Sequence, residues 1–165
     1  MFGKKKQPSP PFVLQVLTTE YLIEGTVEGD TLLYFPALDI LDSPPLRLTS
    51  VQIQTTRSVD IPTRTCAQFM VMGDNAVTLV PRMEISQLAQ REAWKVPDIP
   101  LLGVFYFGPY VMQGKLMLLR DGYFEGEMPM FDVDIASQIP GTRWGELHAP
   151  FALVNGRWLH GFEPR

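Results

Sequence analysis

The sequence predicts a mainly β protein, built as a tandem pair of small barrel-like or curled-sheet units with one connecting helix. Three observations support this fold class. Short runs of β-branched and aromatic residues recur along the 165 residues. The chain contains 15 prolines, which separate short elements and are excluded from helix interiors. Landmarks of the first half also return in the same order in the second half.

The strand predictions rest on apolar runs with alternating polarity. Within 46–54 the alternation changes phase at Thr49-Ser50, which predicts a β-bulge there. Gly25 and Gly114 lie inside predicted strands and indicate bends or bulges. The predicted strands are Phe12–Leu17, Tyr21–Val27, Leu46–Ile53, Phe69–Met72, Val77–Val80, Val104–Phe107, Tyr110–Leu119, Pro150–Val154 and Trp158–Phe162.

Helix signals are fewer than strand signals. The strongest helix-forming stretch, Glu84–Glu92, follows Pro81 and precedes Pro97, an arrangement typical of a helix with a proline at its start and another beyond its end. Short helical turns are also predicted at Ala37–Leu41 and near Phe131–Ser137.

An internal repeat organises the chain. Tyr21–Val27 resembles Tyr110–Leu116, and Phe69–Val77 resembles Phe151–Leu159, after which each copy reaches a Pro-Arg pair, Pro81-Arg82 or Pro164-Arg165. One unit of about 60 residues buries too little apolar surface to be stable alone, so the two units are expected to share an interface. The predicted segments are a flexible basic and proline-rich tail (1–11), a first β unit (12–82), a helical linker (83–100) and a second β unit (101–165).

The first unit resembles a small bacterial domain family of unknown function. The matching segments are an "IEG" strand at Tyr21–Val27, a short "LSDFLN"-like helix at Ala37–Leu41, an "LTD" strand at Leu46–Val51 and a closing "VN" hairpin at Phe69–Pro81. The sequence departs from this pattern where Asp42-Ser43 replaces the asparagine and Ser50 replaces the aspartate; the second half shares mainly the first strand and the hairpin with Val154-Asn155. The resemblance, with a more distant similarity to Sm-like small barrels, implies a fold and no chemistry.

Charge and cysteine content exclude several classes of protein. The net charge of −4 argues against a general phosphate-binding surface. A single cysteine, Cys66, excludes a disulfide within the chain and fits a reducing, cytoplasmic location. The basic start at 1–6 is followed by the polar, proline-rich segment 7–11 instead of an apolar one, so no signal peptide is expected. The most apolar window, 101–119, is interrupted by Gly108-Pro109, and no transmembrane segment is predicted.

The possible metal ligands gather in the second half: Glu146, His148 and His160, with Asp132 and Asp134 upstream. Two histidines and a carboxylate suit iron or zinc. However, Asn155-Gly156 predicts a tight hairpin in which the two histidines point apart, unless a bulge at Pro150 brings them to one face. No metal site and no cofactor is therefore predicted, and a metal-dependent enzyme is a disfavoured alternative.

No catalytic residues are predicted. Cys66 has Arg64 nearby, but both histidines lie in the other half, so the sequence places no base beside the thiol. No phosphate-binding glycine loop and no nucleophile elbow is present. The chain is expected not to be an enzyme.

The leading hypothesis is a non-catalytic interaction or assembly module that binds a protein partner or itself. It rests on the absence of a catalytic constellation, on the duplication and on an apolar-rich second half. The large apolar side chains of that half either leave a surface patch or fill the core. The alternative is a module that binds nucleic acid or a small anionic ligand through Lys4, Lys5 and Lys6, which are also suited to peripheral contact with an anionic membrane. The candidate interface residues are Phe105, Tyr106, Phe107, Tyr110, Met112, Met128 and Met130.

Overall fold

The computed structural model describes residues 10–29, 45–57, 61–82, 99–118, 126–141 and 146–165. The strands of the first half are β1 (Phe12–Thr18), β2 (Tyr21–Val27), β3 (Leu46–Thr55), β4 (Arg64–Val71) and β5 (Ala76–Arg82). Those of the second half are β6 (Ile99–Phe107), β7 (Tyr110–Leu118), β8 (Glu127–Ser137), β9 (Glu146–Asn155) and β10 (Leu159–Pro164). Single 3-10 turns, η1 (Gly73–Asn75) and η3 (Gly156–Trp158), precede β5 and β10.

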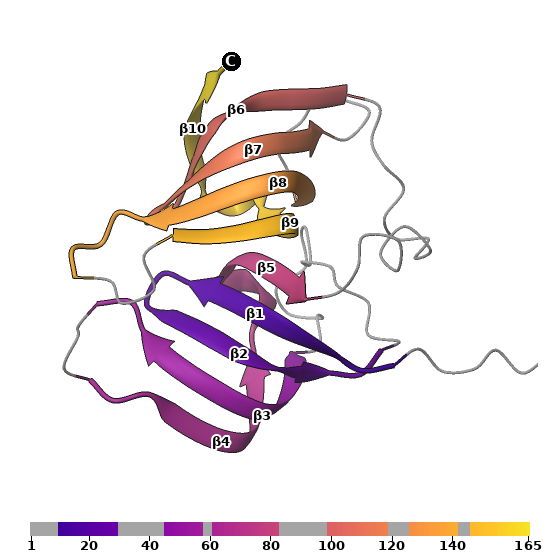
Figure 1. Ribbon diagram of the computed structural model, residues 1–165, viewed down its shortest axis with the longest axis vertical. Coiled ribbons are helices and arrows are strands. Elements are labelled where there is room, and N and C mark those ends of the chain that lie inside the picture. The colour runs from indigo at the N-terminus through magenta and orange to yellow at the C-terminus, as the bar shows by residue number, and fades with distance from the viewer. Residues whose placement is uncertain (1–9, 30–44, 58–60, 83–98, 119–125, 142–145) are drawn as a thin grey trace, which may run out of the picture.

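The strands form one antiparallel sheet of ten strands in the order β10-β6-β7-β8-β9-β5-β1-β2-β3-β4. Figure 1 shows the sheet curling in each half, with β5 and β9 side by side where the halves meet. The prediction of a mainly β chain is confirmed.

The strand order of the first half returns in the second. The first half runs β5-β1-β2-β3-β4 and the second runs β10-β6-β7-β8-β9. The register returns as well: Leu14 pairs with Gly25 between β1 and β2, and Gly103 pairs with Gly114, both 89 residues later, between β6 and β7. Each strand of the first half therefore has a counterpart, at the same place, in the second.

The pairing between the first and last strands of each half also recurs. Val16 lies opposite Leu79 between β1 and β5, and their counterparts Phe105 and Phe162 lie opposite each other between β6 and β10. The register shift near the end of β1, at Leu17/Thr18, has its equivalent between β10 and β6. Equivalent residues of the two halves are 89 positions apart in sequence for β1/β6 and β2/β7, and 83 positions apart for β5/β10.

A β-bulge interrupts both halves at corresponding places. Ser50 in β3 has φ 51 and Asp132 in β8 has φ 48, and the ladders to β2 and β7 shift at Gly25 and Gly114. A Cβ on Gly114 would lie 3.0 Å from backbone oxygens of β8, so the glycine lets the bulged strand approach closely. The bulge predicted in β3 from the phase change is confirmed, as is the prediction that the two glycines mark bulges.

Two clusters of buried side chains form the core, and each crosses the boundary between the halves. The cluster around β6 to β9 includes Leu17 and Val77 from the first half. The cluster around β1 to β4 includes Phe151 and Leu153 from β9. The halves thus share buried apolar surface, as the small size of each one requires.

The predicted hairpin at Asn155-Gly156 is wrong. β9 pairs with β8 and β5, whereas β10 pairs with β6, so the strands on either side of the turn do not pair with each other. The Asn155 side chain instead accepts a hydrogen bond from the Arg157 backbone N–H at 3.1 Å and caps η3. The equivalent closing hairpin in the first half is wrong for the same reason, because β5 pairs with β1 and β9 and not with β4.

The helical turn predicted at Phe131–Ser137 is also wrong, because these residues lie in β8 and bury alternate side chains at Val133 and Ile135. The turn predicted at 37–41, the helix predicted at 84–92 and the tail at 1–9 lie outside the described residues. β6 begins at Ile99, so the last two residues of the predicted linker belong to a strand. In the part of the chain that the structure describes, no helix has the length and apolar character needed to cross a membrane.

Candidate functional site

The two halves are joined by β5 of the first and β9 of the second. Thr78 pairs with Val154 and Leu79 with Leu153 in an antiparallel ladder. The Thr78 hydroxyl donates to the Leu153 carbonyl oxygen at 2.8 Å, and both residues are buried. The Asn155 side-chain amide donates to the Ala76 carbonyl oxygen at 3.1 Å. We call this contact the internal junction.

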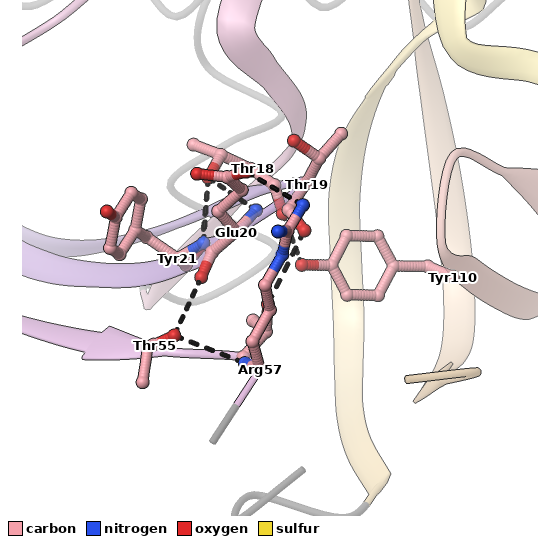
Figure 2. Close-up of polar contacts among 8 residues, drawn as sticks. Thr18, Thr19, Glu20, Tyr21, Thr55, Arg57 and Tyr110 are labelled. Carbon is pink, nitrogen blue, oxygen red and sulfur yellow. Dashed lines mark hydrogen bonds and ion pairs between the residues drawn. The ribbon is translucent and has the colours of Figure 1, made fainter. Parts of the chain in front are cut away.

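A tyrosine from the second half extends the internal junction to the turn between β1 and β2. The Tyr110 hydroxyl donates to the Thr18 carbonyl oxygen, and burial raises the pKa of Tyr110. Figure 2 shows the Tyr110 ring reaching this turn, with the Tyr21 ring on the opposite side. The turn itself is held by the Thr18 hydroxyl, which accepts from the backbone N–H of Tyr21 at 2.9 Å, and by an Arg57–Glu20 ion pair at 2.8 Å.

The 3-10 turns meet at one end of the internal junction. The Trp158 indole N–H in η3 donates to the Asp74 carbonyl oxygen in η1 at 3.2 Å. The Arg157 guanidinium lies 3.7 Å from the Asp74 carboxylate. The internal junction is therefore held by backbone pairing, four buried or half-buried side-chain donors and a partly exposed ion pair.

The sheet ends in two different outer strands. Among the described residues, β4 has only β3 beside it and β10 has only β6. β4 corresponds to β9, and β10 corresponds to β5, so the outer strands are the counterparts of the two strands that form the internal junction. Figure 1 shows β4 and β10 at opposite ends of the molecule.

Large apolar side chains are exposed on and near these outer strands. Their counterparts at the internal junction are buried. Tyr21 and Tyr110 are the same residue type, so the difference between these two lies in their surroundings. The exposed fractions are 45% for Met70, 48% for Met72, 37% for Phe162 and 44% for Tyr21. The buried counterparts are, in the same order, Leu153, Asn155, Leu79 and Tyr110.

The interface predicted from the apolar run in the second half is corrected by the structure. Six of its seven residues belong to the core and expose nothing: Phe105, Phe107, Tyr110, Met112, Met128 and Met130. These side chains fill the interior of the curled second half. The seventh, Tyr106, is partly exposed and donates to the Glu163 carboxylate at 2.7 Å, a hydrogen bond that raises the pKa of Tyr106.

Sequence reasoning missed the exposed outer-strand residues. Met70 lies in a run that reads as an ordinary half-buried strand, and nothing in it shows which strand lies at the end of a sheet. The internal repeat could have revealed Met70, because β4 is the counterpart of β9. This inference becomes possible once β9 is known to pair across the internal junction.

The possible metal ligands are not brought together. His148 Nδ1 lies 2.6 Å from Asp134 Oδ1 in an exposed pair across β8 and β9, while His160 is on β10. The part of the chain that the structure describes holds no group of three side chains suited to bind a metal ion. Cys66 is half-buried on β4, opposite Val51. Lys4, Lys5 and Lys6 lie outside the described residues.

Comparison of the chain with known protein families, with curated proteins and with solved structures finds no match.

Proposed function

We propose that the chain is a non-catalytic assembly module made of two copies of one small β unit, which associates through the outer strands of its sheet. The duplication is supported by the recurrence of strand order, register and bulge in the two halves. Unrelated units rarely share all three, because register and bulge position are set by local sequence.

One observation carries the assembly role: apolar side chains are exposed on β4, an outer strand. An outer strand presents backbone N–H and C=O groups that can pair with another chain, and native proteins blunt such strands with lysine, proline or bulges. β4 reads RTCAQFMV, holds neither lysine nor proline, and carries one charged residue, Arg64, at its start. Met70 and, just beyond the strand, Met72 add exposed apolar surface at the other end of this strand.

Magnitudes indicate that both backbone and side chains must take part. Fully covering a methionine or phenylalanine contributes roughly 1.5–3 kcal/mol, and these side chains are already about half covered. Association costs an estimated 4–15 kcal/mol in lost translational and rotational freedom, by order of magnitude. Two methionines alone are insufficient, so the contact needs a paired strand and further apolar burial.

The test is light scattering coupled to size exclusion over a range of protein concentrations. The wild-type chain should give a mass that is a multiple of 18.7 kDa. Met70→Lys places a charge on the outer strand and should return the mass to that of one chain. The matched control is Gln113→Lys, which makes the same charge change at an exposed position on the interior strand β7.

The control variant should keep the wild-type mass, and circular dichroism should show that both variants are folded. A wild-type chain that stays at a single-chain mass at every concentration would contradict the proposal. So would a Met70→Lys variant that associates as the wild type does.

A further inference from the structure

We propose that the partner of each outer strand is a second copy of this chain: β10 of one copy pairs antiparallel with β4 of the next, in the register of the internal junction. This inference rests on the proposed assembly function and names its partner and geometry. The internal junction serves as the template, because it already joins a β5-type strand to a β9-type strand within one chain.

The register of the contact follows from the correspondence of strands. β10 stands in the place of β5, and β4 in the place of β9, each related by 83 residues. The internal pair Leu79–Leu153 therefore maps onto Phe162 of one copy and Met70 of the next. These are two of the large apolar side chains that the single chain leaves exposed.

The exposure of Phe162 and Met70 agrees with this register. Leu79 and Leu153 are buried because each half covers the other at the internal junction. Phe162 is partly covered by a stacked contact with Phe105, with ring centroids 5.7 Å apart, and its remaining surface is where the internal junction would place a second strand. Pairing in the proposed register covers both Phe162 and Met70.

A tyrosine supports the same arrangement. At the internal junction Tyr110 of one half reaches the carbonyl oxygen of Thr18 in the other. Its counterpart Tyr21 is exposed, and the counterpart of Thr18 is Phe107. In the proposed contact, Tyr21 of the second copy lies against the turn that follows Phe107 of the first.

Gly161 of β10 is the counterpart of Thr78, which pairs across the internal junction. A Cβ built on Gly161 would meet nothing within 4 Å, so the face of β10 is open at this position. The hydrogen bonds that the Thr78 and Asn155 side chains make at the internal junction have no equivalents, because Gly161 replaces Thr78 and Met72 replaces Asn155. The contact between copies is thus weaker than the internal junction and depends on concentration.

The proposed contact joins unlike strands, so it is heterologous and repeats from copy to copy. Such contacts give a closed ring when the rotation between copies closes, and an open row when it does not. Pairing of like strands, β4 with β4 or β10 with β10, would instead give a dimer about a twofold axis and then stop.

Cysteine cross-linking distinguishes these arrangements in the full chain. The background is Cys66→Ala, and the test variants are Met70→Cys and Phe162→Cys, made separately and mixed under oxidation. Residues directly opposite in an antiparallel ladder have Cα atoms about 4.5–5.5 Å apart, which lies within the range for a disulfide. The matched control replaces Phe162→Cys by Glu163→Cys, whose side chain points to the other face of β10.

We expect a covalent dimer only when Met70→Cys and Phe162→Cys are mixed, at a rate at least tenfold above the mixture of Met70→Cys with Glu163→Cys. A chain carrying both cysteines should give a ladder of multimers on a non-reducing gel. His160→Cys with Met72→Cys, the next pair on the same face of the proposed register, provides a second test on exposed positions.

Dimers formed by either single-cysteine variant alone would overturn the inference in favour of like-with-like pairing. Multimers in light scattering without the mixed cross-link would overturn the inference and leave the assembly function standing. A single-chain mass with no cross-link would overturn both.

Discussion

The hydroxyl of Tyr110, in the second half, donates a buried hydrogen bond to the carbonyl oxygen of Thr18, in the first, and so links two turns separated by 92 residues. Burial of this hydroxyl keeps it protonated in the folded chain to a higher pH than in the unfolded chain, because its pKa is raised. One side chain thereby couples the docking of the two halves to pH.

Stability should therefore fall as the pH rises above about 10, where an unfolded tyrosine ionises and the folded Tyr110 does not. One proton that is retained in the folded state alone lowers the free energy of unfolding by about 1.4 kcal/mol per pH unit. Tyr110→Phe removes this contribution, so the slope of stability against pH between 10 and 11 should be shallower in the variant. Urea unfolding at each pH measures it, and identical slopes in variant and wild type would contradict the assignment.

The bulges store backbone strain that glycine would relieve. Ser50 and Asp132 both have positive φ, which costs an L-residue about 1–2 kcal/mol. After the backbone entropy of glycine is subtracted, Ser50→Gly should stabilise the chain by about 0.5–1 kcal/mol. Asp132→Gly should gain less, because aspartate tolerates this conformation better than serine.

The control for this pair is Gln52→Gly, at an exposed position of β3 outside the positive-φ set, which should destabilise by about 0.5–1 kcal/mol. Chemical denaturation of the three variants tests the ranking. Loss of stability in Ser50→Gly would show that the serine side chain, and not the backbone, decides the energy at this bulge.

A side chain at Gly114 should be costly. A Cβ there would lie 3.0 Å from the carbonyl oxygens of Phe131 and Asp132, which are backbone atoms and cannot rotate away. Gly114→Ala is expected to lower the free energy of unfolding by about 1–3 kcal/mol. Gly161→Ala, where an added Cβ meets nothing within 4 Å, should change it by less than about 0.5 kcal/mol. Equal effects in the two variants would exclude close packing as the reason for the glycine.

The hydroxyl of Thr78 should contribute measurably to the internal junction. Thr78→Val keeps the shape but removes the donor to the buried Leu153 carbonyl oxygen, at an expected cost of about 1–2 kcal/mol. Thr49→Val removes a longer hydrogen bond, 3.3 Å to the Thr26 carbonyl oxygen, at a half-exposed site and should cost less. Thermal or urea unfolding compares the two, and a neutral Thr78→Val would show that water or backbone satisfies the oxygen.

Local features of the fold could be predicted from the sequence because they depend on neighbouring residues. The phase change at Thr49-Ser50 marked the bulge, and Gly25 and Gly114 marked the points where two strands come close. The landmarks of the repeat fell on corresponding strands, although the structure aligns the final segments through Gly73 and Gly156, one residue away from the match by sequence.

Pairings between distant segments could not be predicted in the same way. Asn155-Gly156 has the composition of a tight hairpin, yet the Asn155 side chain caps η3, and β9 pairs across the internal junction instead. The sequence fits Phe105 and Met112 equally to a surface patch and to the core, because it does not show how much interior so short a chain can form. Curling of the second half around them supplies that interior.

The two ends of the sheet are unlike, because one is β10 and the other is β4. A row of copies joined β10 to β4 would therefore have a direction, whereas a twofold dimer has none. In the proposed row, a copy that can pair through only one of its outer strands stops the addition of further copies at that end. A chain cut after Trp158 keeps β4 but lacks β10, and small amounts of it mixed with intact chains would stop growth at one end while leaving the other open. Under the proposed contact, the proportion of such cut chains would set the length of the row.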